Sequence, residues 1–222
     1  IADNITDPAF DRDQILITVH PQHRDVWFWL IPLSPDKCSF GVVARKEFFD
    51  GFNTTDLGAI LQQLKETTPP LQQLLSRSEF LFPPRHLAGY ACNVKSLHGD
   101  GFALLGNAGE FLDPVFSSGV TIAMKSAALA ADVLVRKQRG EPVNWQTEYA
   151  QPLKQGVDTF RCFVEAWYDG RLQDIIFAPN QTPSIKEMIS SILAGYAWDL
   201  DNPYVAESKR RINVLAQICR PG

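Results

Sequence analysis

The chain has 222 residues, of which 45% are hydrophobic and 21% charged, and its formal net charge is −4 at pH 7. This is the composition of a globular protein that can bury a core. The acidic balance, without a lysine–arginine block, argues against a general nucleic-acid surface. No apolar run reaches the roughly 18 residues of a membrane-spanning helix. The four cysteines form no CxxC pair, so we expect reduced thiols in a cytoplasmic protein.

Three short segments near the start predict an antiparallel meander. Residues 14–20, 26–32 and 38–44 are rich in β-branched and aromatic residues and are separated by polar turns. In the middle strand Trp27, Trp29 and Ile31 share one face, because side chains alternate along a strand. An aromatic face of this kind packs in a core or lines a ligand cavity. The pattern favours the core and leaves the cavity open.

Helices are predicted by apolar residues at helical spacing. Thr54 or Thr55 is placed to cap a helix that runs to about Glu66, and Pro69-Pro70 interrupts it before residues 71–76. Asn144 is placed to cap a long helix that continues to about residue 169. Two further helices are predicted over residues 184–193 and 203–218.

The stretch from Gly101 to Arg136 predicts a short buried strand over residues 102–105, a turn at Gly106-Asn107, a loop, and a long helix from about Ser118. A helix N-terminus presents unpaired N–H groups and the positive pole of the helix dipole. It therefore favours an anion or an electron-rich ring edge. On spacing alone, a plain structural corner explains the stretch equally well.

Taken together, these elements predict an α+β layout, or the remainder of an α/β protein without its first half. His20 and His23 flank a turn without further ligands, so we expect no metal site. The sequence contains no GxSxG elbow, P-loop or complete GxGxxG. Glu110 and Asp113 are close in sequence, but their spacing does not force them onto one face as an acid–base pair.

Two motifs resemble the signatures of flavin-dependent halogenases. The sequence WFWLIP at 27–32 fits WxWxIP, and FLDPVFSSG at 111–119 fits FxxPxxSxG. The segment GFALLGNAG, at 101–109, resembles the second flavin-contacting motif shared with the related aromatic-hydroxylase type of monooxygenase. The resemblance covers most of the chain and is firmest over residues 14–137.

The resemblance implies the remainder of an α/β FAD/NAD(P)-binding flavoprotein fold that lacks its N-terminal dinucleotide-binding half. Residues 1–100 would be a substrate-side antiparallel sheet with a helical insertion. Residues 101–137 would be the second flavin-contacting strand, loop and helix, and residues 138–222 a C-terminal helical region. Because the chain begins at Ile1 rather than methionine, we expect it to be part of a longer protein and inactive alone.

The resemblance also implies site residues. Backbone N–H groups of Ser118 and Gly119 would hold a halide ion, and Trp27 and Trp29 would form a wall between flavin and substrate. The catalytic lysine of the family belongs to its N-terminal part, so no lysine of this chain takes that role. The FAD contacts would be Gly106, Asn107, Pro114, Ser118, Gly119 and Val120.

Two positions depart from the most common pattern. Asn107 stands where the flavin motif usually has aspartate; it can accept a hydrogen bond but carries no charge. Phe116 stands where tryptophan-acting members have glutamate, as in members that act on phenols or pyrroles, often tethered to carrier proteins.

The resemblance therefore implies halogenation of a small aromatic substrate with halide, oxygen and reduced FAD from a flavin reductase. One alternative is a non-halogenating FAD-dependent monooxygenase or reductase of the same scaffold. A second alternative is a catalytically silent binding module, with Asn107 as its clue.

Overall fold

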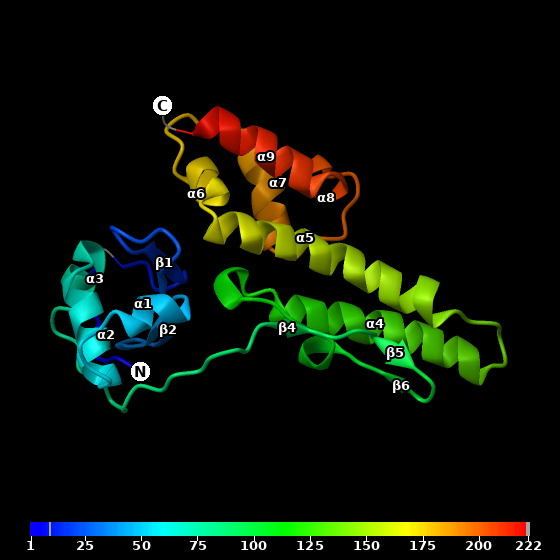
Figure 1. Ribbon diagram of the computed structural model, residues 1–222, viewed down its shortest axis with the longest axis horizontal. Coiled ribbons are helices and arrows are strands. Elements are labelled where there is room, and N and C mark those ends of the chain that lie inside the picture. The colour runs from blue at the N-terminus through cyan, green and yellow to red at the C-terminus, as the bar shows by residue number, and fades with distance from the viewer. Residues whose placement is uncertain (9, 221–222) are drawn as a thin grey trace. The chain divides into compact units, whose positions relative to one another are not determined.

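The computed structural model describes residues 1–8 and 10–220 and consists of two compact units, Ile1–Ala88 and Gly89–Gly222 (Figure 1). Each unit combines helices with small antiparallel sheets. The predicted mixture of antiparallel sheet and C-terminal helices is thereby confirmed. The predicted division into residues 1–100, 101–137 and 138–222 was made by functional role. It stays a prediction.

The first unit is built on the predicted three-stranded meander. Alternation along the middle strand places Phe28 and Leu30, both fully buried, in a hydrophobic core cluster. Trp27 and Trp29 lie on the opposite face of that strand, as predicted. The core of this unit therefore lies on the face away from the two tryptophans. The strands are β1 (Leu16–Val19), β2 (Trp27–Ser34) and β3 (Lys37–Val43), paired in that order.

The helix predicted to end at Glu66 is present, but its cap is Asp56. The Asp56 carboxylate accepts hydrogen bonds from the N–H groups of Gly58, at 2.8 Å, and Ala59, at 3.3 Å. Thr54 instead accepts from the N–H of Asp56, at 3.1 Å. The prediction of a threonine cap was wrong because the aspartate is the residue directly before the first helical turn. The helices are α1 (Lys46–Asp50), which was not predicted, α2 (Leu57–Glu66) and α3 (Pro69–Leu74).

The second unit begins with short paired strands. The strand predicted over residues 102–105 is shorter, and its burial was predicted wrongly: Phe102 is 51% exposed and Leu105 38%. The reason is that this strand belongs to a two-stranded hairpin, which leaves side chains open to solvent. The strands are β4 (Cys92–Asn93) paired with β7 (Glu110–Phe111), and β5 (His98–Gly99) paired with β6 (Phe102–Ala103).

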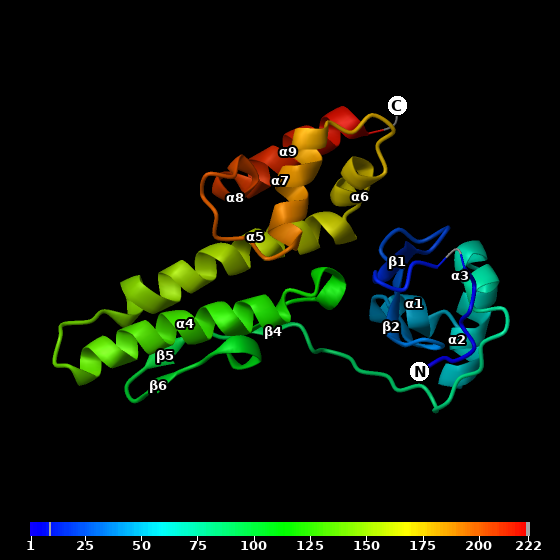
Figure 2. The same cartoon turned by 180° about the vertical axis from the view of Figure 1, so that it is seen from behind.

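Helices make up the rest of the second unit, and α4 and α5 are the longest (Figure 2). The predicted cap at Asn144 is confirmed: its Oδ1 accepts from the N–H of Gln146, at 2.9 Å, and of Thr147, at 3.1 Å. The helix predicted over residues 203–218 is broken at Glu207. The helices are α4 (Gly119–Gln138), a π-helical turn (Gln146–Ala150), α5 (Gln151–Tyr168), α6 (Arg171–Ile176), α7 (Pro183–Leu193), α8 (Pro203–Ala206) and α9 (Ser208–Cys219).

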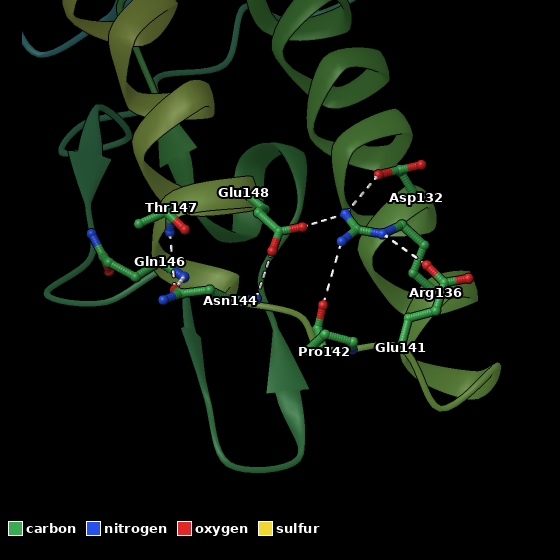
Figure 3. Close-up of polar contacts among 8 residues, drawn as sticks. All are labelled: Asp132, Arg136, Glu141, Pro142, Asn144, Gln146, Thr147 and Glu148. Carbon is green, nitrogen blue, oxygen red and sulfur yellow. Dashed lines mark hydrogen bonds and ion pairs between the residues drawn. The ribbon is translucent and has the colours of Figure 1, made fainter.

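Arg136, near the end of α4, makes polar contacts with the connection to the π-helical turn before α5 (Figure 3). Its guanidinium contacts Glu148, lies 3.4 Å from Glu141 Oε2, and donates to the carbonyl of Pro142 at 3.4 Å. Glu148 also accepts from the N–H of Asn144, at 2.8 Å. The Asn144 N–H and the Arg136 guanidinium together lower the pKa of Glu148. The two long helices are thus joined by a charged and capped corner.

Candidate functional site

The candidate site is the loop between β6 and α4, and a glycine fixes its first turn. Gly106 has a φ of +52°, in the left-handed region that favours glycine. A Cβ at Gly106 would lie 3.1 Å from Ala123 Cβ. The Gly106 N–H donates to Ser126 Oγ at 2.9 Å, and that hydroxyl donates to the Ala123 carbonyl at 2.8 Å. The turn is therefore seated directly on α4.

In the middle of the loop, the carboxylates of Glu110 and Asp113 bind side chains outside the loop. Asp113 accepts hydrogen bonds from the hydroxyl groups of Tyr168, at 2.7 Å, and Tyr90, at 3.4 Å. Glu110, only 3% exposed, pairs with Arg161 at 2.9 Å. Both carboxylates have structural partners of their own, which gives each a role in holding the loop on α5.

Burial shifts the pKa values of Asp113 and Tyr90. Burial raises the pKa of Asp113, although the hydrogen bonds from Tyr168, the Val115 N–H and Tyr90 oppose the change. Burial, together with the neighbouring Asp113 charge, raises the pKa of Tyr90 to about 12. Tyr90 therefore remains a hydrogen-bond donor throughout the neutral range.

The end of the loop delivers uncapped amides to the start of α4. A 3₁₀ turn (Pro114–Phe116) leads into Ser117, which has a left-handed φ of +52° that is unusual for a residue with a side chain. Ser118 follows as the buried N-cap, and its side chain makes no cap hydrogen bond. Ile122 makes the helical bond to the Ser118 carbonyl, so the N–H groups of Gly119, Val120 and Thr121 precede the helical ladder.

Gly119 faces open space at this helix end. Apart from the adjacent residues and the backbone of α4 itself, a Cβ there would have one neighbour within 4 Å, Asn107 Oδ1 at 3.8 Å, and the φ of Gly119 is not in the left-handed region. Neither packing within the described chain nor backbone strain therefore demands glycine here. A missing side chain at such a position leaves room for an approaching ligand, so the residues present fit a bound anion or an electron-rich ring edge.

The loop brings several predicted site residues together. Asn107 and Gly119, twelve positions apart in sequence, lie next to each other. Asn107, Pro114 and Gly119 are exposed, and Val120 is 72% exposed, whereas Gly106 and Ser118 are buried. Their contacts with a cofactor stay predictions.

The sequence analysis did not predict the residues outside the motifs that hydrogen-bond to this loop. Ser126, Tyr90 and Tyr168 come from distant positions and belong to no recognisable motif. Ser126 offered one signal: it is a small polar residue four positions after Ile122, on the buried face of an apolar helix.

The predicted tryptophan wall belongs to the first unit. Trp27 is buried, and the Trp27 and Trp29 ring centroids lie 6.1 Å apart. Trp29 Nε1 donates to Ser39 Oγ at 3.1 Å, and the Trp29 indole covers Gly41, where a Cβ would meet the ring at 2.1 Å. Trp29 also lines an apolar cavity of about 620 Å³ beside β3. The pair thus shows both features that the sequence left open, burial at Trp27 and a cavity at Trp29.

The histidine pair has a local role in its turn. His20 Nδ1 accepts hydrogen bonds from the N–H groups of Gln22, at 3.1 Å, and His23, at 3.2 Å. Burial and the neighbouring His23 lower the pKa of His20. Within residues 1–8 and 10–220, no group of three or more His, Cys, Asp or Glu side chains is arranged for a metal ion. In the same residues, no helix is both long and apolar enough to cross a membrane.

Comparison with known proteins gives a consistent result. The family model described as tryptophan halogenase matches residues 17–207. A 1H-pyrrole-2-carbonyl-[peptidyl-carrier protein] chlorinase of Pseudomonas fluorescens is 29% identical over 202 residues, which are 90% of this chain and 44% of the relative. The corresponding brominase of Pseudoalteromonas luteoviolacea is 30% identical over 142 residues, 64% of this chain and 34% of the relative.

A solved structure agrees with the fold. The crystal structure of a flavoprotein/dehydrogenase from Cytophaga hutchinsonii matches 98% of this chain with a TM-score of 0.88 and 39% identity. The match covers 54% of that longer chain. The present chain therefore spans about half, or less, of the length of the proteins it matches.

Proposed function

The chain belongs to the tryptophan halogenase family, and on this premise we propose that it is the C-terminal part of an FAD-dependent halogenase. The observation that carries the proposal is the open position at Gly119, beside Asn107 and in front of uncapped helix amides. This combination favours a ligand that is anionic or rich in electrons.

The loop residues would hold the flavin of FAD. The amides at the start of α4 and the helix dipole stabilise negative charge on a carbonyl edge, and Asn107 Oδ1 supplies a hydrogen-bond acceptor. When bound, reduced flavin with oxygen supplies the oxidising equivalents that convert halide to hypohalous acid. The proposed contacts are Gly106, Asn107, Pro114, Ser118, Gly119 and Val120.

A halide ion would be held by the N–H groups of Ser118 and Gly119. The Gly119 N–H opens α4, where the side chain of the N-cap residue Ser118 makes no hydrogen bond that would compete for the amides. The absence of a Cβ at Gly119 keeps the approach to these amides free. Charge-assisted hydrogen bonds of this kind are stronger than neutral ones.

Trp27 and Trp29 would separate the substrate from the flavin. Their tilted rings lie on one face of β2 and would form an aromatic wall between the two sites. Such a wall would prevent direct contact between an organic substrate and oxidised species on the flavin side, which favours halogenation over hydroxylation.

The substrate class we propose is a phenol- or pyrrole-like aromatic, which a carrier protein can present. The chlorinase and the brominase named above act, by their names, on a carrier-bound pyrrole. Phe116 supports this branch, because its ring packs edge-on against Trp167 at 6.1 Å and places no carboxylate at this point of the loop.

The complete protein would contain the parts that this chain lacks. The proposed missing part is an N-terminal dinucleotide-binding half with the catalytic lysine. A flavin reductase would be a separate partner protein that supplies reduced FAD. A cytoplasmic location and the inactivity of the isolated chain stay predictions. The share of each relative that the chain covers supports a longer protein.

A non-halogenating flavoprotein is the second candidate. It is favoured by the 39% identity to a protein described as a flavoprotein/dehydrogenase, which exceeds the 29% identity to the chlorinase. A silent binding module, suggested by the neutral Asn107, is the third.

The test is an assay of the full-length protein with a flavin reductase, NADH, FAD, oxygen and either chloride or bromide. Pyrrole- and phenol-type substrates, free and carrier-bound, are analysed by mass spectrometry. A halide-dependent mass increase supports the proposal. An oxygenated product without halide supports the monooxygenase, and lack of flavin binding supports the binding module.

A further inference from the structure

Ala2, at the start of the first unit, forms isolated β-bridges to two segments, one on each side. Ala2 and Cys38 exchange two backbone hydrogen bonds, each of 2.9 Å. On the other side, the N–H of Leu81 donates to the carbonyl of Ile1 at 2.9 Å, and Ala2 bridges Phe80. Ala2 thus pairs with Cys38 of β3 on one side, and Ile1 and Ala2 pair with residues 80–81 on the other.

The remainder of this β3 edge is open. The polar groups of Cys38 point away from β2, where its partner Pro32 has no N–H to offer. Backbone direction repeats every second residue in a strand, so the N–H and C=O groups of Phe40 and Val42 point to the same outer edge. Among the described residues, no backbone partner is found for Phe40 or Val42 on that side.

An apolar groove lies along this open edge. It is the cavity of about 620 Å³ that Trp29 lines, and every residue of its lining belongs to the first unit. On the β3 side it is lined by Phe40 and Val42. Further lining residues are Ile1, Phe80 and Phe82. A free strand edge beside an apolar wall has the features of a site for one more strand.

The pairing already present fixes the register of such a strand. Ala2 opposes Cys38 in an antiparallel arrangement, so residues placed before Ile1 in the same strand direction would run toward Val42. The residue directly before Ile1 would oppose Phe40, and the third residue before Ile1 would oppose Val42. Their side chains would lie on the face of Cys38 and Phe40, which belong to the hydrophobic core cluster.

We propose that, in the complete protein, the residues directly preceding Ile1 continue this strand along β3 and fill the groove. The inference rests on the proposed function, which places an N-terminal half before this chain. A covalently continuous segment has the advantage over a free ligand or a second copy, because its local concentration is high and its register is set. The cavity beside Trp29 is then occupied by protein rather than by the aromatic substrate.

Disulfide trapping in the flavin-free, full-length protein tests the register. Val42→Cys is combined with cysteine at the third residue before Ile1, and the oxidised protein is digested and analysed by mass spectrometry. Opposed residues of a hydrogen-bonded antiparallel pair have Cα atoms about 5.5 Å apart, within disulfide range. The matched control combines Val42→Cys with cysteine at the second residue before Ile1, which points to the other face. We expect a cross-linked peptide from the first pair and none from the control.

Hydrogen exchange on the unmodified full-length protein is the second measurement. The amides of Phe40 and Val42 are expected to exchange at least tenfold more slowly than in an open strand edge. Rapid exchange at both amides, or equal cross-linking by the two cysteine pairs, would overturn the inference. So would a small aromatic ligand or a second copy seated in the groove. None of these readouts requires flavin, so they are independent of whether the enzyme halogenates.

Discussion

The Gly106 N–H and Ser126 Oγ lie 2.9 Å apart, and this bond ties the first turn of the loop to α4. The bond is buried, and Ser126 is fully enclosed. Since a buried N–H without a partner is costly, the position of Asn107, the next residue, depends on a serine that no motif includes.

Ser126→Ala is expected to destabilise the chain by about 1–3 kcal/mol, because it leaves the Gly106 N–H buried without an acceptor. Chemical denaturation monitored by circular dichroism measures the change. The control is Ser190→Ala, at an exposed position of α7, which should alter stability by less than about 0.5 kcal/mol. Equal effects of the two substitutions would contradict the assigned role of Ser126.

Gly119→Val is expected to abolish halide-dependent product in the full-length protein while the fold persists. The added side chain would fill the open space in front of the helix amides, where the nearest chain atom is Asn107 Oδ1. Ala127→Val, at an exposed position of α4, is the matched control for the β-branched side chain. Product formation and thermal denaturation are measured on both variants, and unchanged halogenation by Gly119→Val would refute the halide assignment.

Gly41→Ala is expected to destabilise the first unit by about 1–3 kcal/mol through overpacking. A Cβ would lie 2.1 Å from the Trp29 indole, so the ring must move and weaken its bond to Ser39. The cost should fall when Trp29→Phe removes the ring atoms that the Cβ meets. A double-mutant cycle by urea denaturation measures this coupling, and strict additivity would show that the contact is unimportant.

Glu148→Gln is expected to lower the midpoint of thermal unfolding at pH 7. The Asn144 N–H and the Arg136 guanidinium lower the pKa of Glu148 in the folded chain. A lowered carboxyl pKa stabilises the fold above the unfolded value of about 4.3, and this contribution is lost as the pH falls through the folded pKa. The difference between variant and parent should therefore shrink below about pH 4.

Thermal unfolding between pH 3 and pH 7 provides that measurement. Glu187→Gln, which removes an exposed carboxylate on α7, is the control and should leave the profile unchanged. A constant difference across the whole range would contradict the role given to the Glu148 charge.

The sequence predicted elements well where a pattern is local. The meander of the first unit follows from alternation in three short segments, and the Asn144 cap follows from a single residue before a helix. Asp56 was missed because two threonines nearby offered the same chemistry, and only the geometry of the turn selects among them. Boundaries of this kind depend on one or two hydrogen bonds.

The site was predictable only in part, for a physical reason. Gly106, Asn107 and Gly119 belong to motifs, so their residue types are visible in the sequence. Their common location depends on Ser126 and Tyr168, which act across 20 and more positions. Such contacts arise from the packing of α4 and α5 and leave no periodic signal.

The attachments of the loop to α5 and to the π-helical turn before it also limit how its length can change. Leu104, Glu110 and Asp113 contact Tyr149, Arg161 and Tyr168, in the same order along both segments. The three contacts therefore fix the register of the loop against its helical partners at three separate points. A deletion of one residue between Leu104 and Asp113 would move at least one of these contacts out of register, so we expect this connection to tolerate substitutions better than changes in length.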